Sequence, residues 1–338
     1  MNTIEVKLAL VSFKIITPST RKEFYSKVID KMVSELNGLD IECKINNLCL
    51  QFQMEICSDK ELVEKLFPEC RMHSYVFIIK SKSDINPFIR KRTEEYKQAF
   101  SDEKEDKDFD WTNSCLRDLA DYIEKYIYDI MLGINITYPG LFQIASGEIN
   151  IINTYYLRIN NINNNLVDVY EDWLDKEWPD LVELSFKDTW KWICKNTNYL
   201  DGICDSPIDR ALNALSYSFN SNNYEDLFYT LLGIEALYNT NKSEGIIEQI
   251  KTKIKCMFGE PVKFKKDINN MYSIRSLFVH GKLNFPSKFQ IDLYDEGFYD
   301  KSYVPTVTIA HSILLATLRK LIKQNASEMV FTTILTLK

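Results

Sequence analysis

An arginine and a histidine, Arg275 and His280, stand near the end of the chain with four residues between them, in a mostly apolar stretch. The guanidinium of arginine stays charged at physiological pH, and its planar fork of N–H donors can hold a phosphate and stabilise charge that develops on it. The imidazole of histidine can accept and release a proton near neutral pH. Together the two residues can cleave RNA without a metal ion.

The spacing of this pair limits how it can act. The apolar pattern predicts a helix over residues 265–280, which Gly281 would end. Five residues on an ideal helix turn through roughly 500°, so the side chains of Arg275 and His280 would lie about 140° apart. One rigid helix would therefore not bring them together unaided. The alternative is a structural role for both, because the apolar residues between them are typical of a core.

Two further residues belong with this pair. Glu235 is a carboxylate in the apolar run 231–237, and burying an unpaired charge is costly, so we expect it to have a cationic partner. Tyr272 lies one helical turn before Arg275, where its ring could stack on a base or pack in the core. Packing is the favoured alternative for Tyr272.

The charge of the chain is unevenly distributed. The whole chain carries −7, which argues against general nucleic-acid binding, but residues 251–288 hold nine basic and two acidic residues, a local charge of +7. A basic stretch beside the Arg–His pair is suited to the phosphate backbone of RNA. The predicted RNA contacts are Lys263, Lys265, Lys266, Lys282 and Tyr272. The alternative is that these lysines only solvate an exposed face.

Four blocks of the C-terminal half stand in the order that one family shows. They are SFKDTWKWI (185–193), SPIDRAL (206–212), YEDLFYTLLGIEALY (224–238) and RSLFVHG (275–281). With these blocks, the region from Leu184 to about Lys323 resembles the ApeA-like branch of the HEPN superfamily. Active members of that superfamily are RNases of prokaryotic defence and toxin systems. The chain departs from the pattern at Ser276, where many HEPN nucleases carry Asn, Asp or His.

The resemblance implies a metal-independent endoribonuclease that uses no cofactor. His280 would be the general acid or base, Arg275 the phosphate clamp and Glu235 an orienting group. The ribose 2′-OH would attack the adjacent phosphorus, so DNA would resist cleavage. The family also implies a homodimer with two Arg–His sets across a shared cleft, and a setting of phage defence or toxicity, with a phage-derived trigger or an antitoxin as a further partner.

Two other functions stay open at this point. The chain could be a non-catalytic HEPN-like module for dimerisation or RNA binding, with Ser276 marking lost chemistry. It could also be the regulated partner of a nucleotidyltransferase, since HEPN proteins occur in such pairs. Cleavage of RNA in the presence of EDTA separates the first alternative from the nuclease.

Local patterns predict an α+β N-terminal domain over residues 1–183, with a sensing or regulatory role, and an all-α HEPN-type helical bundle over residues 184–338. In the first domain we expect strands over 4–16 and 73–80, helices over 20–37 and 114–132, and a short helix capped by Ser58. In the second we expect helices over 206–220, 222–238, 243–254, 265–280 and 306–324, and a final strand over 329–337.

The remaining residues bear on compartment and on the other histidines. The eight cysteines form no C-x-x-C motif, which predicts neither a zinc site nor a disulfide framework but reduced thiols in the cytoplasm. We expect no signal peptide and no membrane span. His311 stands at helical spacing with apolar residues and reads as a core histidine, while His73 begins an apolar strand without a catalytic partner.

Overall fold

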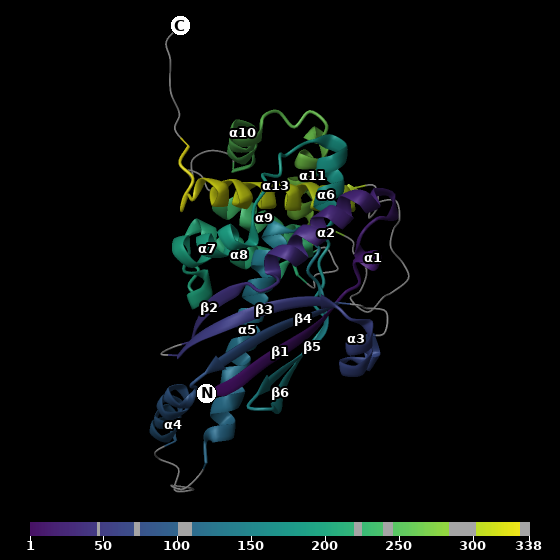
Figure 1. The fold of residues 1–338 in the computed structure, drawn as a ribbon. Coiled ribbons are helices and arrows are strands. Elements are labelled where there is room, and N and C mark those ends of the chain that lie inside the picture. Colours follow the sequence, from purple (N-terminus) through teal and green to yellow (C-terminus); the bar gives the residue numbers. More distant parts are fainter. Residues whose placement is uncertain are drawn as a thin grey trace. The chain divides into compact units, whose positions relative to one another are not determined.

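The computed structural model describes residues 1–45, 48–70, 75–100, 110–219, 225–238, 246–283 and 302–331, and the chain divides into two compact units (Figure 1). Unit 1 comprises Met1–Met131 and Phe142–Ile162, and unit 2 comprises Leu132–Leu141 and Asn163–Lys338. The fold is therefore mixed, with an N-terminal sheet unit followed by a helical unit. The boundary predicted near residue 183 lies within unit 2.

Unit 1 is built on a six-stranded antiparallel sheet of order β2-β3-β4-β1-β5-β6 (Figure 1). The strands are β1 (Asn2–Leu10), β2 (Asp40–Ile45), β3 (Leu48–Ser58), β4 (Tyr75–Ser83), β5 (Ile144–Ile151) and β6 (Thr154–Ile159). β2 and most of β3 alternate strictly between buried and exposed residues, which is typical of a sheet with one face in the core. Lys7 and Lys80 on the opposite face form cross-strand ion pairs with Glu148 and Glu55.

Helices of unit 1 cover parts of both faces of this sheet. They are α1 (Phe13–Ile16), α2 (Lys22–Leu36), α3 (Lys60–Leu66), α4 (Asn86–Ala99) and α5 (Thr112–Thr137), which continues into unit 2. Tyr126 of α5 stacks on Phe52 of β3 at 5.8 Å and donates a hydrogen bond to the carbonyl of Glu42. On the other face, Val63 and Phe67 pack with Ala9, Val76 and Ile78.

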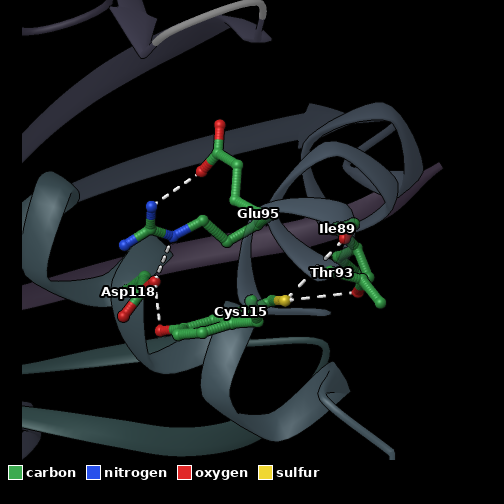
Figure 2. A network of polar contacts seen from close by, with 7 residues as sticks. Ile89, Thr93, Glu95, Cys115 and Asp118 are labelled. Carbon is green, nitrogen blue, oxygen red and sulfur yellow. Dashed lines mark hydrogen bonds and ion pairs between the residues drawn. The ribbon is translucent and has the colours of Figure 1, made fainter. Parts of the chain in front are cut away.

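A polar network joins α4 to α5, as Figure 2 shows. The Asp118 carboxylate accepts hydrogen bonds from Arg92 Nε at 2.5 Å and from the Tyr96 hydroxyl at 2.7 Å. Arg92 also donates to Glu95, while the Cys115 thiol contacts Thr93 and donates to the Ile89 carbonyl. Next to the network, the ring of Trp111 stacks against those of Tyr96 and Phe100, which also stack on each other. The ends of the two helices are thus held together by charge and by aromatic packing.

Two local predictions for unit 1 were wrong. The strand expected to run to residue 16 ends at Leu10, because the chain then turns and buries Phe13 against Tyr75. Asp59, and not Ser58, caps α3, since its carboxylate accepts a hydrogen bond from the backbone N–H of Leu62. β4 begins at Tyr75, and His73 lies outside the described residues.

Unit 2 is helical in its described residues. Its helices are α6 (Asp168–Lys176), α7 (Phe186–Asn196), α8 (Pro207–Tyr217), α9 (Glu225–Leu237), α10 (Ile246–Phe258), α11 (Lys265–Val279) and α13 (Val304–Gln324). Almost every residue of α13 is buried, and α6, α7, α9 and α11 contact this helix (Figure 1). The expected final strand is absent from the described part of its range, because residues 329–331 carry no regular structure.

The caps of unit 2 follow the sequence signals. The Ser206 hydroxyl accepts a hydrogen bond from the Asp209 N–H, while the Asp209 carboxylate accepts one from the Ser206 N–H, and Pro207 occupies the first turn. Gly233 of α9 packs directly on α13, where an added Cβ would lie 3.0 Å from a methyl carbon of Leu314. These features fix where α8 begins and how closely α9 approaches α13.

Within the described residues, no helix is both long enough and apolar enough to cross a membrane. All eight cysteines lie in the described ranges, and none of them forms a disulfide.

A buried arginine, Arg319, joins three segments of unit 2. It donates hydrogen bonds to the carbonyls of Val182, Ile136 and Thr137 at 2.9, 2.8 and 2.7 Å, and the last two carbonyls end α5. Those carbonyls lie at the negative end of the helix dipole, so they favour a cation. Burial lowers the pKa of the guanidinium, which makes these bonds necessary for keeping it charged in the core.

Replacing Arg319 by methionine should destabilise the protein by about 3–5 kcal/mol, because three buried carbonyls would lose their donors. Denaturant unfolding measures this loss. The matched control is Arg210→Met, which removes one exposed hydrogen bond to the Asp205 carbonyl and should cost no more than about 0.5 kcal/mol. Equal losses in the two variants would show that the Arg319 bonds are not important.

Candidate active site

The side chains of Glu235 and Arg275 meet between α9 and α11. Glu235 Oε1 lies 3.1 Å from Arg275 Nε, and Oε2 lies 3.3 Å from the terminal nitrogen Nη2. This is a two-point pairing of a carboxylate with a guanidinium, which fixes the plane of the guanidinium. The expected cationic partner of Glu235 is therefore Arg275.

The helices bring these residues together because their other faces are buried. Leu231 and Ile234 of α9 and Met271 and Ile274 of α11 lie in the core. Glu235 and Arg275 then fall at the edge of the packed surface, with 22% and 33% of their side chains exposed. A ligand can thus reach the guanidinium from solvent while the carboxylate holds it from behind.

Burial is the main influence on the Glu235 carboxyl. It raises the pKa of Glu235, and the attraction and hydrogen bond of Arg275 oppose that rise. Tyr272, one turn before Arg275, is only 6% exposed, and its hydroxyl has no hydrogen-bond partner among the described residues. Burial also raises the pKa of this phenol, an effect that the Glu235 charge strengthens. Tyr272 therefore packs beside the ion pair, and in this conformation its ring offers no face for a base to stack on.

His280 lies at the C-terminal end of α11 and is exposed. The helix ends in a Schellman motif, with hydrogen bonds from Gly281 N–H to the Phe278 carbonyl and from Lys282 N–H to the Leu277 carbonyl. Gly281 adopts a φ of 64°, which favours glycine, so the predicted helix stop is confirmed. The motif holds the backbone of His280 in place while its imidazole remains open to solvent.

Only part of the expected constellation comes together in one copy of the chain. Glu235, Arg275 and Tyr272 are neighbours, but within the described ranges no hydrogen bond or ion pair joins His280 to Arg275 or Glu235. Arg275 lies in the body of α11 and His280 at its end, as the helical offset of about 140° predicts. The four predicted RNA-contacting lysines, Lys263, Lys265, Lys266 and Lys282, are all exposed.

An aromatic cluster on α9 and α11, near the ion pair, was not predicted from the sequence. The ring of Phe228 in α9 lies 5.7 Å from that of Phe278 in α11, and Tyr229 packs on both Phe228 and Tyr217. Leu232 and Leu277 are exposed on the same two helices. Exposed apolar side chains near a charged site are suited to contact with another protein surface. Phe228 and Phe278 lie 50 residues apart in the chain, so no local pattern could reveal their contact.

Two other titratable groups of unit 2 take no part in the Glu235–Arg275 pairing. Burial raises the pKa of Asp226 to about 8, but this residue precedes Glu235 by nine positions on α9, about 13 Å along the helix axis. His311 is buried in α13, as expected of a core histidine, and burial lowers its pKa to about 4. In the part of the chain that the structure describes, no group of three or more His, Cys, Asp or Glu side chains could hold a metal ion.

No protein-family model matches this chain, and no curated protein or solved structure matches it either. A functional assignment therefore depends on the geometry of these side chains and on the resemblance of the four sequence blocks.

Replacing Arg275 by alanine should destabilise the protein more at pH 7 than at pH 4. Without its partner, the carboxylate of Glu235 must stay half-buried and unpaired at pH 7, whereas at pH 4 it takes up a proton and loses its charge. Urea unfolding of the wild type and the variant at both pH values measures the difference. The double variant Arg275→Ala/Glu235→Gln should recover about 1 kcal/mol at pH 7 and lose this pH dependence. A single-variant loss that is the same at both pH values would contradict the pairing.

Proposed function

We propose that this protein is a metal-independent endoribonuclease of the ApeA-like HEPN type, acting on RNA in the cytoplasm. The observation that supports it best is the two-point pairing of Glu235 with Arg275 on the helix that ends at His280. A guanidinium has five N–H donors, and Glu235 occupies Nε and Nη2. The donors of Nη1 have no partner among the described residues, so they can bind a phosphate oxygen.

The reaction is a transesterification within RNA. The ribose 2′-oxygen attacks the adjacent phosphorus and gives up its proton to a base, and the bond from phosphorus to the 5′-oxygen breaks. An acid protonates the leaving 5′-oxygen. The products are a 2′,3′-cyclic phosphate and a 5′-hydroxyl end. Arg275 stabilises the negative charge on the phosphate oxygens during this step.

The step needs a base and an acid, and the chain supplies one exposed histidine among its described residues. In a homodimer, two copies of His280 share these roles across one cleft. The exposed side chains of Leu232 and Leu277 and the contact between Phe228 and Phe278 support this arrangement, because these apolar residues lie on the helices that carry Glu235 and Arg275.

Purified protein should cleave single-stranded RNA in the presence of EDTA and leave DNA of the same sequence intact. His280→Ala and Arg275→Ala should each slow cleavage by about 10²–10⁴-fold, since one removes the proton-transfer group and the other the phosphate clamp. Arg275→Lys should also be poor, because an ammonium does not reproduce the fork. Gel analysis of end-labelled RNA, with detection of the cyclic phosphate, measures these effects.

The matched control for the arginine variants is Arg210→Ala, an exposed arginine on α8 that should leave cleavage unchanged. Full activity of His280→Ala would exclude the proposed chemistry. If the protein binds RNA but never cleaves it, even when its trigger is supplied, the non-catalytic module would be the better assignment.

The double variant Leu232→Glu/Leu277→Glu should convert the dimer to a monomer and abolish cleavage, because charges would have to be buried between the two copies. Sedimentation at micromolar concentration, alongside the cleavage assay, measures both effects. The matched control is Ile203→Glu, which changes an exposed apolar residue that lies between η3 (Tyr199–Asp201) and α8. A monomeric variant that retains full activity would refute the shared cleft.

A further inference from the structure

Unit 2 contains a pocket between α10 and α11 that lies outside the Glu235–Arg275 site. Its cavity volume is about 140 Å³. Three lysines line it, Lys251 and Lys255 from α10 and Lys265 from the start of α11, together with Glu248 of α10 and Asn269 of α11. The apolar part of the wall comes from Ile254, Pro261 and Ile268. The pocket thus combines a polar, basic lining with an apolar wall.

The spacing on the two helices explains why the basic groups meet. Lys251 and Lys255 are four residues apart and so share one face of α10, as Lys265 and Asn269 share one face of α11. The turn over residues 259–264 connects the two helices, with Gly259 at a φ of 78°. Of the nine basic residues in 251–288, these three therefore converge on one place.

Other elements of unit 2 hold the wall of the pocket. The indole N–H of Trp178 donates to the Phe258 carbonyl at 2.9 Å, and its ring packs on Phe264 at 5.5 Å. Lys320 of α13 donates to the Met257 carbonyl at 2.7 Å. The end of α10 and the turn after it are thus fixed from two sides, so a ligand would meet a preformed site.

The three lysines make only weak interactions within the protein. Glu248 pairs with Lys251 at 2.9 Å and Glu260 with Lys255 at 3.1 Å, but both carboxylates are largely exposed, and exposed ion pairs contribute little. Lys265 makes no hydrogen bond or ion pair with the residues that the structure describes. An anion that enters the pocket can therefore displace the carboxylates and bind all three ammonium groups.

We propose that this pocket binds a backbone phosphate of the RNA substrate, away from the bond that is cleaved. The inference rests on the proposed nuclease function and names a second contact for the same strand. Lys265 and Arg275 lie on one helix ten residues apart, about 15 Å along its axis. A strand held at both places runs along α11, which positions the scissile phosphate at Arg275.

The test measures binding of a short, fully 2′-O-methylated RNA, which cannot be cleaved, by fluorescence anisotropy between 50 and 300 mM salt. Lys251→Gln/Lys255→Gln/Lys265→Gln should weaken binding roughly tenfold and lower the slope of log affinity against log salt by about 0.7, the value for one phosphate on a single strand. The matched control, Lys187→Gln/Lys191→Gln/Lys195→Gln, removes three exposed lysines of α7 and should have little effect.

A second pair of variants tests for tighter RNA binding, a result that misfolding cannot produce. Glu248→Gln/Glu260→Gln frees Lys251 and Lys255 from their partners and should tighten binding of the same RNA. The control, Asp201→Asn/Glu328→Gln, changes the net charge equally at exposed positions elsewhere in unit 2 and should tighten it less.

The pocket proposal is overturned if the two triple variants bind RNA alike or if the wild type binds no RNA. These outcomes are separate from the fate of the nuclease. If the wild type cleaves RNA and both triple variants bind RNA equally, the proposal for the pocket is rejected and the nuclease proposal stands. If only the pocket variant loses RNA binding and the wild type never cleaves RNA, the proposal for the pocket stands and the nuclease proposal is rejected.

Discussion

The buried guanidinium of Arg319 fixes α13, the helix on which α9 and α11 pack with the residues of the candidate site. A charged group in the core must find strong acceptors, and the three carbonyls around Arg319 come from segments far apart in the chain. The end of α5, the segment before α7, and α13 are joined as a result. α9 and α11 contact α13, with Gly233 allowing the close approach of α9. The positions of Glu235 and Arg275 therefore depend on a residue that touches neither of them.

The partial exposure of the Glu235–Arg275 pair allows it both a structural and a chemical role. If it were fully buried and fully hydrogen-bonded, it would be structural only, and if it were fully exposed the guanidinium would have no fixed orientation. Partial exposure lets one edge of Arg275 bind the carboxylate while the other edge faces solvent. Burial raises the pKa of Glu235, and the attraction and hydrogen bond of Arg275 oppose that rise, so Arg275 favours the charged form of the carboxyl that the pairing requires.

The sequence predicted features that depend on neighbouring residues. The helix start at Ser206 and the glycine stop at Gly281 depend on signals within a few positions, and the need of Glu235 for a cationic partner follows from the cost of burial alone. The identity of that cation, Arg275, could be known only from the tertiary fold.

The elements that were not predicted have weak local signals. α4 buries only Phe88 among its fourteen residues, so its apolar periodicity is faint. β5 contains Gly147 and has irregular register with both neighbours, and its pairing with β1 joins residues about 140 positions apart. The aromatic cluster of Phe228 and Phe278 has the same origin, because two helices must pack before it exists. Long-range packing decides these features, and no window of the sequence contains it.

The difference in burial between His311 and His280 decides which of them can exchange protons with a substrate. His311 lies in the core of α13, and with a pKa near 4 it stays neutral at neutral pH, out of reach of a substrate. His280 lies in solvent at a helix end whose backbone is fixed by the bonds of Gly281 and Lys282. A group that exchanges protons with a substrate needs access and a fixed position at the same time. Of these two histidines only His280 combines access with a fixed backbone, which is the physical reason for proposing that it carries the proton transfers.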